Sequence, residues 1–70
     1  MMEFIEQERW SQLPWYIFIP GGQYAYVIGK TGQYESELDK ALPFYEWIDA
    51  LTYVEKHGYE KIATIRKVLV

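Results

Sequence analysis

Residues 15–34 are rich in aromatic side chains, carry a single charge and contain paired glycines: WYIFIPGGQYAYVIGKTGQY. Aromatic and β-branched residues favour strands, and a Gly-Gly pair suits the left-handed dihedrals of a tight turn. The stretch therefore predicts a β-hairpin with strands over residues 15–20 and 23–28, joined at Gly21 and Gly22. Both faces of this hairpin are apolar, and a chain of 70 residues has little other material to cover them.

The register of the hairpin assigns each side chain to a face. With Gly21 and Gly22 as the loop, Phe18 faces Ala25, and a further strand over residues 33–38 extends the meander. The first face would carry Tyr16, Phe18, Ala25, Val27, Tyr34 and Leu38. The second would carry Trp15, Ile17, Ile19, Tyr24, Tyr26 and Ile28. We expect a helix to cover the first face and leave the second exposed, although a one-residue slip would exchange the two.

The clearest helix signal covers residues 43–57. Pro43 suits the first helical position, a cationic His57 is favoured in the last turn, and Gly58 can supply the left-handed stop. One apolar stripe, expected to face the sheet, contains Phe44, Trp47, Ile48, Leu51 and Val54, whereas Tyr45, Ala50 and Tyr53 lie off it.

A final strand is predicted over residues 60–69, and the N-terminal residues up to Pro14 form a short helix or an extended arm. The chain is thus predicted to be one α+β domain over residues 1–70. Its elements are a three-stranded antiparallel meander, one amphipathic helix and a C-terminal strand. With the helix as a crossover, the last strand would run parallel to the first, in the strand order 3-2-1-4.

The composition narrows the chemistry. There is no cysteine, and His57 is the only histidine, so a disulfide, a multi-histidine metal site and a histidine-based triad within one chain are excluded. The string Gly29-Lys30-Thr31 resembles part of a phosphate-binding loop, but Tyr24 stands where that loop needs glycine, so a hairpin turn is the better interpretation. We expect no enzymatic activity and no cofactor.

The charges also limit the partners. The net charge is −3 and there is no basic stripe, so extended nucleic acid is not expected. Glu35, Glu37 and Asp39 alternate, which in a strand would place three carboxylates on one side. They could bind a hard cation or a basic partner, but edge charges that discourage aggregation are the preferred explanation. Neither a signal peptide nor a membrane-spanning stretch is evident, so we expect a cytoplasmic protein.

These expectations lead to two functional hypotheses. The first is a non-enzymatic interaction protein, homo-oligomeric, of the inhibitor or accessory type found in bacteria and their viruses. It would bind through the second face, with Trp15, Ile17, Tyr24, Tyr26 and Ile28 as anchors. The second is a small-ligand or nucleotide-sequestering protein with aromatic stacking at a subunit interface. In that case Lys30, Arg66 or Lys67 would meet the phosphate.

Overall fold

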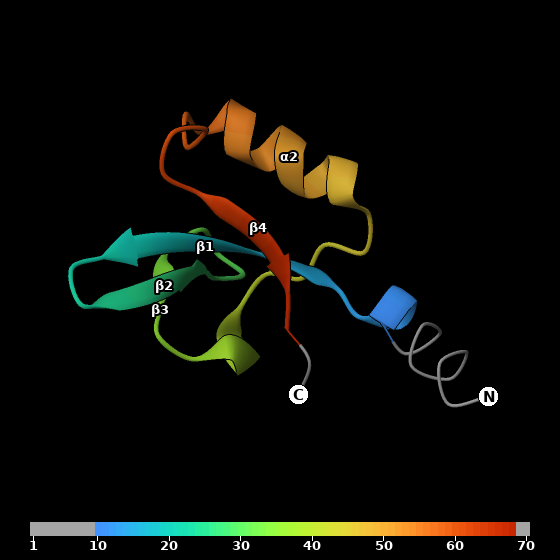
Figure 1. Ribbon diagram of the computed structural model, residues 1–70, viewed down its shortest axis with the longest axis horizontal. Helices are drawn as coiled ribbons and strands as arrows, with labels where there is room; N and C mark the ends of the chain where they lie inside the picture. The colour runs from blue at the N-terminus through green and yellow to red at the C-terminus, as the bar shows by residue number, and fades with distance from the viewer. Residues whose placement is uncertain (1–9, 69–70) are drawn as a thin grey trace.

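The computed structural model describes residues 10–68 and shows a four-stranded antiparallel sheet in the order β3-β2-β1-β4 (Figure 1). The strands are β1 (Trp15–Gly21), β2 (Tyr24–Ile28), β3 (Tyr34–Glu35) and β4 (Thr64–Lys67). Helix α2 (Trp47–Lys56) packs on one face, and η1, a 3-10 helix (Leu38–Lys40), lies on the other side. The α+β class and the strand order 3-2-1-4 are confirmed.

The two ends of the chain were predicted less fully than the middle. Residues 10–12 are helical, in agreement with the predicted short N-terminal helix, but the earlier part of that prediction lies outside the described residues. The predicted final strand over residues 60–69 is shorter, because residues 60–62 form a turn. Residue 69 again lies outside the described part.

The turn of the hairpin lies one residue later than predicted. Gly21 pairs with Tyr24, which leaves Gly22 and Gln23 as the loop. Gly22 has a φ of 69°, and no described residue other than glycine has a positive φ. A positive φ at the first loop position alone fits a type II′ turn, whose twist matches that of the strands. Because the loop still contains two residues, the side chains of β1 and β2 stay on their predicted faces, but Phe18 is opposite Val27 and not Ala25. The prediction for β3 is wrong: Tyr34 is opposite Ile28 and so lies on the second face, and Glu35 lies on the first.

Between β3 and α2 the chain crosses β2 on the face away from the helix. Phe44 pairs with Trp15 on the β2 side of β1, since the other side of Trp15 pairs with Lys67. β3 lies beside β2 on the side away from β1, whereas Phe44 lies on the side of β2 that faces β1, so the chain between them has crossed β2. Figure 1 shows η1, which belongs to this stretch, on the face opposite α2. Val27 points to this face and is only 3% exposed, which agrees with its being covered there. We name residues 36–40 the crossing segment.

This crossing explains the one topological error. It returns the chain to the start of β1, so α2 runs toward the hairpin end and β4 comes back antiparallel to β1. Trp15 pairs with Lys67 and Phe18 pairs with Thr64. The predicted parallel final strand is therefore wrong, because the third strand ends at Glu35 instead of continuing to residue 38.

Helix α2 covers the face that was predicted to stay exposed. The core joins Ile17, Ile19 and Ile28 of the sheet to Ala50 and Val54 of α2. The prediction that the helix covers the Phe18 face is therefore wrong. Branched aliphatic side chains on adjacent strands make a compact floor, and the small Ala50 lets the helix axis come close to it.

The helix is shorter and turned about its axis relative to the prediction. It begins at Trp47 because Phe44 is engaged with β1, and it ends at Lys56, one residue before the predicted end, with Gly58 at a φ of 73°. Ala50, predicted to lie off the apolar stripe, is buried. Trp47 and Ile48, predicted to face the sheet, are 46% and 58% exposed.

Candidate functional site

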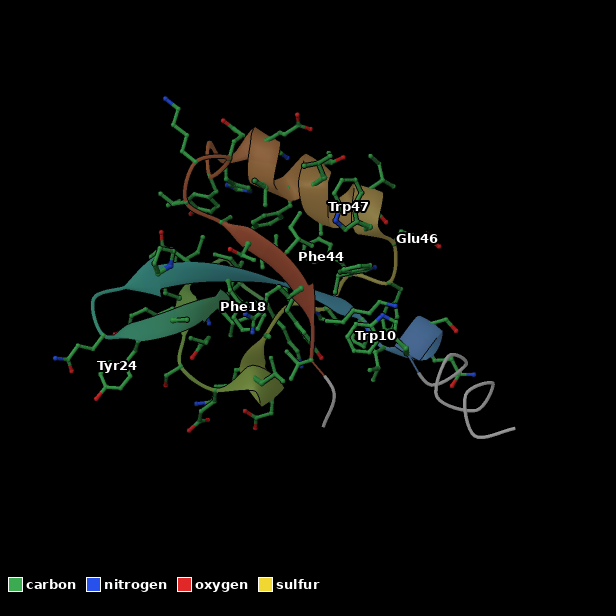
Figure 2. The ribbon with its side chains drawn as sticks, viewed as in Figure 1. Trp10, Phe18, Tyr24, Phe44, Glu46 and Trp47 are labelled. Carbon is green, nitrogen blue, oxygen red and sulfur yellow. The ribbon has the colours of Figure 1, made fainter. Side chains whose placement is uncertain are left out.

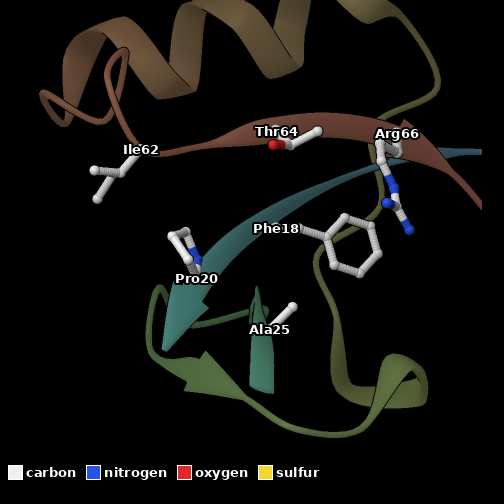
Figure 3. A pocket seen from close by; sticks show the side chains of 6 residues that line it. All are labelled: Phe18, Pro20, Ala25, Ile62, Thr64 and Arg66. Carbon is white, nitrogen blue, oxygen red and sulfur yellow. The ribbon is translucent and has the colours of Figure 1, made fainter. Parts of the chain in front are cut away.

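The sheet face away from α2 carries an uncovered apolar surface next to the crossing segment. Six residues line a shallow hollow of about 250 Å³ there, shown in Figure 3: Phe18, Pro20, Ala25, Ile62, Thr64 and Arg66. We name these six residues the open face. They come from β1, from β2, and from β4 with the turn before it, so pairing along the sheet sets their spacing.

A single cation is fixed over the apolar floor. The Arg66 guanidinium carbon lies 4.9 Å from the centroid of the Phe18 ring. This contact is a cation–π interaction, which orients the guanidinium and leaves its N–H groups free to face a partner. Pairing places Tyr16 beside Arg66 on the same face. Burial, with a smaller contribution from Tyr45, raises the pKa of the Tyr16 phenol, so this group is a neutral hydrogen-bonding group at neutral pH.

The size of the hollow limits what one chain can enclose. Small-molecule pockets usually span about 300–1,000 Å³, so a hollow of about 250 Å³ falls below that range. This hollow, formed within residues 10–68, is therefore a shallow apolar surface with one oriented cation.

A row of six aromatic rings lies on the other side of the sheet, where it joins the β3 edge to α2. Consecutive ring centroids are 4.1–6.4 Å apart along Tyr26, Tyr34, Tyr59, His57, Tyr53 and Phe44. These ring contacts extend the core toward the surface, at the β3 edge of the contact between α2 and the sheet. We name these six residues the aromatic row.

Two phenols of the aromatic row, those of Tyr34 and Tyr53, have raised pKa values. Side-chain hydrogen bonding with Tyr59 is the main cause that raises the pKa of Tyr34, followed by desolvation. Desolvation is the main cause for Tyr53, followed by the nearby Tyr59. A raised phenol pKa moves Tyr34 and Tyr53 further from the phenolate form at neutral pH.

His57 directly follows the last residue of α2, although it was predicted to lie within the last turn, and it belongs to this row. Its ring lies 4.1 Å from that of Tyr53 and 5.9 Å from that of Tyr59. These ring contacts could not be predicted from the sequence, because Tyr59 lies in the segment after the helix.

The structure does not assemble the residues predicted to bind a partner. Ile17 and Ile28 have no exposed surface, so they are core residues and cannot contact another molecule. Trp15 is half-buried against the core, and Tyr26 belongs to the aromatic row. Tyr24 alone of this group is well exposed, at 71%, and Figure 2 shows it at the tip of the hairpin.

The predicted cations also lie apart. Lys30 is exposed in the turn after β2, whereas Arg66 is on β4, beyond β1 in the sheet. Lys67 faces the helix side, where its ammonium donates to the Trp10 carbonyl (2.7 Å) and lies 5.0 Å from the Trp15 ring centroid. Of the predicted binding residues, only Arg66 belongs to the open face.

Sequence reasoning missed the other five residues of the open face. Alternation along β1 and β2 did place Phe18 and Ala25 on one face, but that face was assigned to the helix. Two residues did argue against that assignment: the side chains of Pro20 and Ala25 are too small to fill the space between a sheet and a helix packed on it. The contribution of Ile62 depends on the tight turn before β4, which had been assigned to the strand.

The acidic residues do not form the predicted row. Glu35 ends β3, Glu37 precedes η1 and Asp39 lies within it, so the three carboxylates share no strand. Glu37 instead pairs with Lys40 at 3.4 Å. No group of three or more potential metal ligands occurs within residues 10–68. No helix in that part of the chain is long and apolar enough to span a bilayer.

No protein-family model, curated protein or solved structure matches this chain.

Proposed function

We propose that this protein is a non-enzymatic interaction protein that works as a homo-oligomer, with the open face as the contact between subunits. One observation carries the proposal: α2 covers one face of the sheet, while the apolar residues beside the crossing segment on the other face remain uncovered. The predicted class of function is kept, and its surface moves to the opposite side of the sheet.

The size of the core supports this proposal. Among the described residues, seven hydrophobic side chains are buried, two of them alanines, and no polar or charged side chain is buried. A domain this small has marginal stability when it relies on its own core. Association through the open face would add apolar burial around Phe18 and Ile62.

The residue types of the open face also suit a protein contact. Aromatic residues and arginine contribute most to binding energy at interfaces. Phe18, Arg66 and the neighbouring Tyr16 are side chains of these kinds, and they lie on adjacent strands of a rigid sheet.

A small anionic ligand is the second candidate, and the position of Arg66 favours it. A guanidinium can bind a phosphate or a carboxylate through two parallel hydrogen bonds, and the Thr64 hydroxyl lines the same hollow. Because the hollow is small, a ligand of nucleotide size would also need residues from a second subunit. A nucleotide-sized ligand and the interaction-protein candidate therefore both require assembly, and native mass spectrometry distinguishes them by the presence of a bound compound.

The test is the native mass of the purified protein, measured by light scattering and native mass spectrometry at micromolar concentration. We expect a mass of at least twice the 8.4 kDa of one chain. Ala25→Glu places a charge on the open face at an exposed position and should dissociate the assembly. Tyr24→Ala is the matched control, because Tyr24 is the preceding residue of β2 and points to the other face.

The outcomes separate the alternatives. A wild-type monomer overturns self-association. An oligomer that survives Ala25→Glu and dissociates with Tyr24→Ala would place the contact on the helix side. A bound compound of nucleotide mass that is lost with Arg66→Gln would favour the ligand-binding candidate.

A further inference from the structure

The crossing segment makes the sheet face away from α2, on which the open face lies, uneven in height. It passes over β2 on that side, whereas the β1–β4 half of the same face stays bare. The face therefore has one raised half, next to β3, and one bare half, next to β4.

The two halves also carry opposite charges. Glu35, which is opposite Val27 in the sheet and so points to this face, lies at the start of the raised half. Glu37 and Asp39 follow within the crossing segment, and Lys40 is the only cation there. We name Glu35, Glu37 and Asp39 the acidic ridge. The bare half carries Arg66, fixed over Phe18.

A raised acidic half beside a bare half with a cation is a surface that complements itself. Two identical chains that meet through the same patch must be related by a two-fold axis. If the axis runs parallel to the strands, rotation turns the face over and exchanges the two edges of the sheet. The β3 side of one copy then lies over the β4 side of the other. An axis across the strands would instead place the acidic ridge against its own copy.

We propose that a second copy of this chain docks on the open face about a two-fold axis parallel to the strands, with the acidic ridge of each copy against Arg66 of the other. The inference rests on the proposed function and adds the orientation of the partner. The two crossing segments then form one shared layer between the sheets, each filling the bare half of the opposite copy. Phe18 lies beneath that layer, where burial excludes water from the cation–π contact.

A charge exchange tests this orientation. Arg66→Glu should raise the dimer dissociation constant about tenfold, since it places like charges together at the contact. The double variant Glu37→Lys/Asp39→Lys should weaken the dimer by a similar factor. Combining the three substitutions restores opposite charges across the interface and should recover most of the affinity. Analytical ultracentrifugation gives the constants, and circular dichroism checks that each variant is folded.

Lys56→Glu is the matched control for Arg66→Glu, because it makes the same change of charge at an exposed position of α2. It should leave the dissociation constant within a factor of about two, a difference of under 0.5 kcal/mol.

The possible results distinguish the orientation from the function. If Ala25→Glu dissociates the dimer but the charge exchange gives no recovery, the strand-parallel axis is overturned and the contact surface stands. If Ala25→Glu leaves the dimer intact, the contact surface itself is overturned. A wild-type chain that stays monomeric at several hundred micromolar overturns both.

Discussion

Ile17 on β1 and Ile28 on β2 lie where the sheet meets α2, and neither side chain has any exposed surface. They were identified by sequence as apolar strand residues of one face, but not as core, because alternation alone does not say which face a helix covers. The decision depended on the path of the chain between β3 and α2. Core and interface residues therefore cannot be distinguished at the scale of single residues in this hairpin.

Replacement of a fully buried isoleucine should unfold much of the population. We expect Ile17→Ala to lower the free energy of unfolding by about 2–5 kcal/mol, because it leaves a cavity against Ala50 and Val54. Ile48→Ala removes the same atoms from a side chain that is 58% exposed and should change the free energy by less than about 0.5 kcal/mol. Urea titration followed by circular dichroism measures both. Equal effects would contradict the observed core.

The tyrosines should make stability fall at high pH. The folded-state pKa values of Tyr16, Tyr34 and Tyr53 are raised above the ordinary value of 10.0, so the folded chain holds these protons more tightly than the unfolded chain. Their contribution is fully present below pH 10 and is lost as the pH rises through the folded-state values. We expect a constant urea midpoint from pH 7 to 9 and a decline above pH 10.

One substitution assigns part of this effect. Tyr59→Phe removes the hydrogen-bonding partner that is the main cause of the raised Tyr34 pKa. The Tyr34 phenol, followed by its own ring signals in NMR, should then titrate closer to the ordinary value. An unchanged titration would show that the two phenols do not interact in solution.

At the scale of elements, the sequence predicted the hairpin, the helix and their stop signals, because alternation, turn glycines and helix caps act locally. It missed the length of β3 and the start of α2. β3 ends where the chain turns into the crossing segment. The start of α2 depends on Phe44, whose pairing with Trp15 is a contact between segments far apart in sequence. A tertiary contact of this kind holds the backbone extended where local preference favours a helix.

The helix end offers a test of such a local signal. Gly58 has a φ of 73°, and a Cβ at this position would meet no other atom within 4 Å. Gly58→Ala should therefore cost about 1–2 kcal/mol through backbone conformation alone. Gly58→Asn should cost less, because asparagine tolerates the left-handed region better. Thermal unfolding of both variants measures the difference, and an equal cost would point to a lost contact in place of backbone strain.

At the scale of the whole molecule, class and strand order were predictable, whereas the exposed surface was not. The open face exists because the crossing segment covers only part of the sheet, and no local pattern encodes that path. Arg66 was chosen from the sequence for its charge, but its neighbour Phe18 was assigned to the core.

A self-associating chain should resist heat better when it is concentrated. Unfolding of a dimer releases two chains, so the Tm should rise with protein concentration by mass action. Ala25→Glu should abolish that dependence while the protein remains folded. Tm values of the wild type that agree from about 5 to 500 μM would contradict the proposed assembly.

The crossing segment also decides where the chain can be lengthened. The crossing segment and residues 41–46 carry the backbone past β2 and on to α2, so an insertion there would loosen the connection between the sheet and the helix. Gly22 and Gln23 are exposed in the hairpin loop, and a Cβ at Gly22 would meet no atom within 4 Å. A reporter or an affinity tag placed in that loop would leave the sheet, the helix and the proposed partner surface in their positions, which makes it the natural handle for this protein.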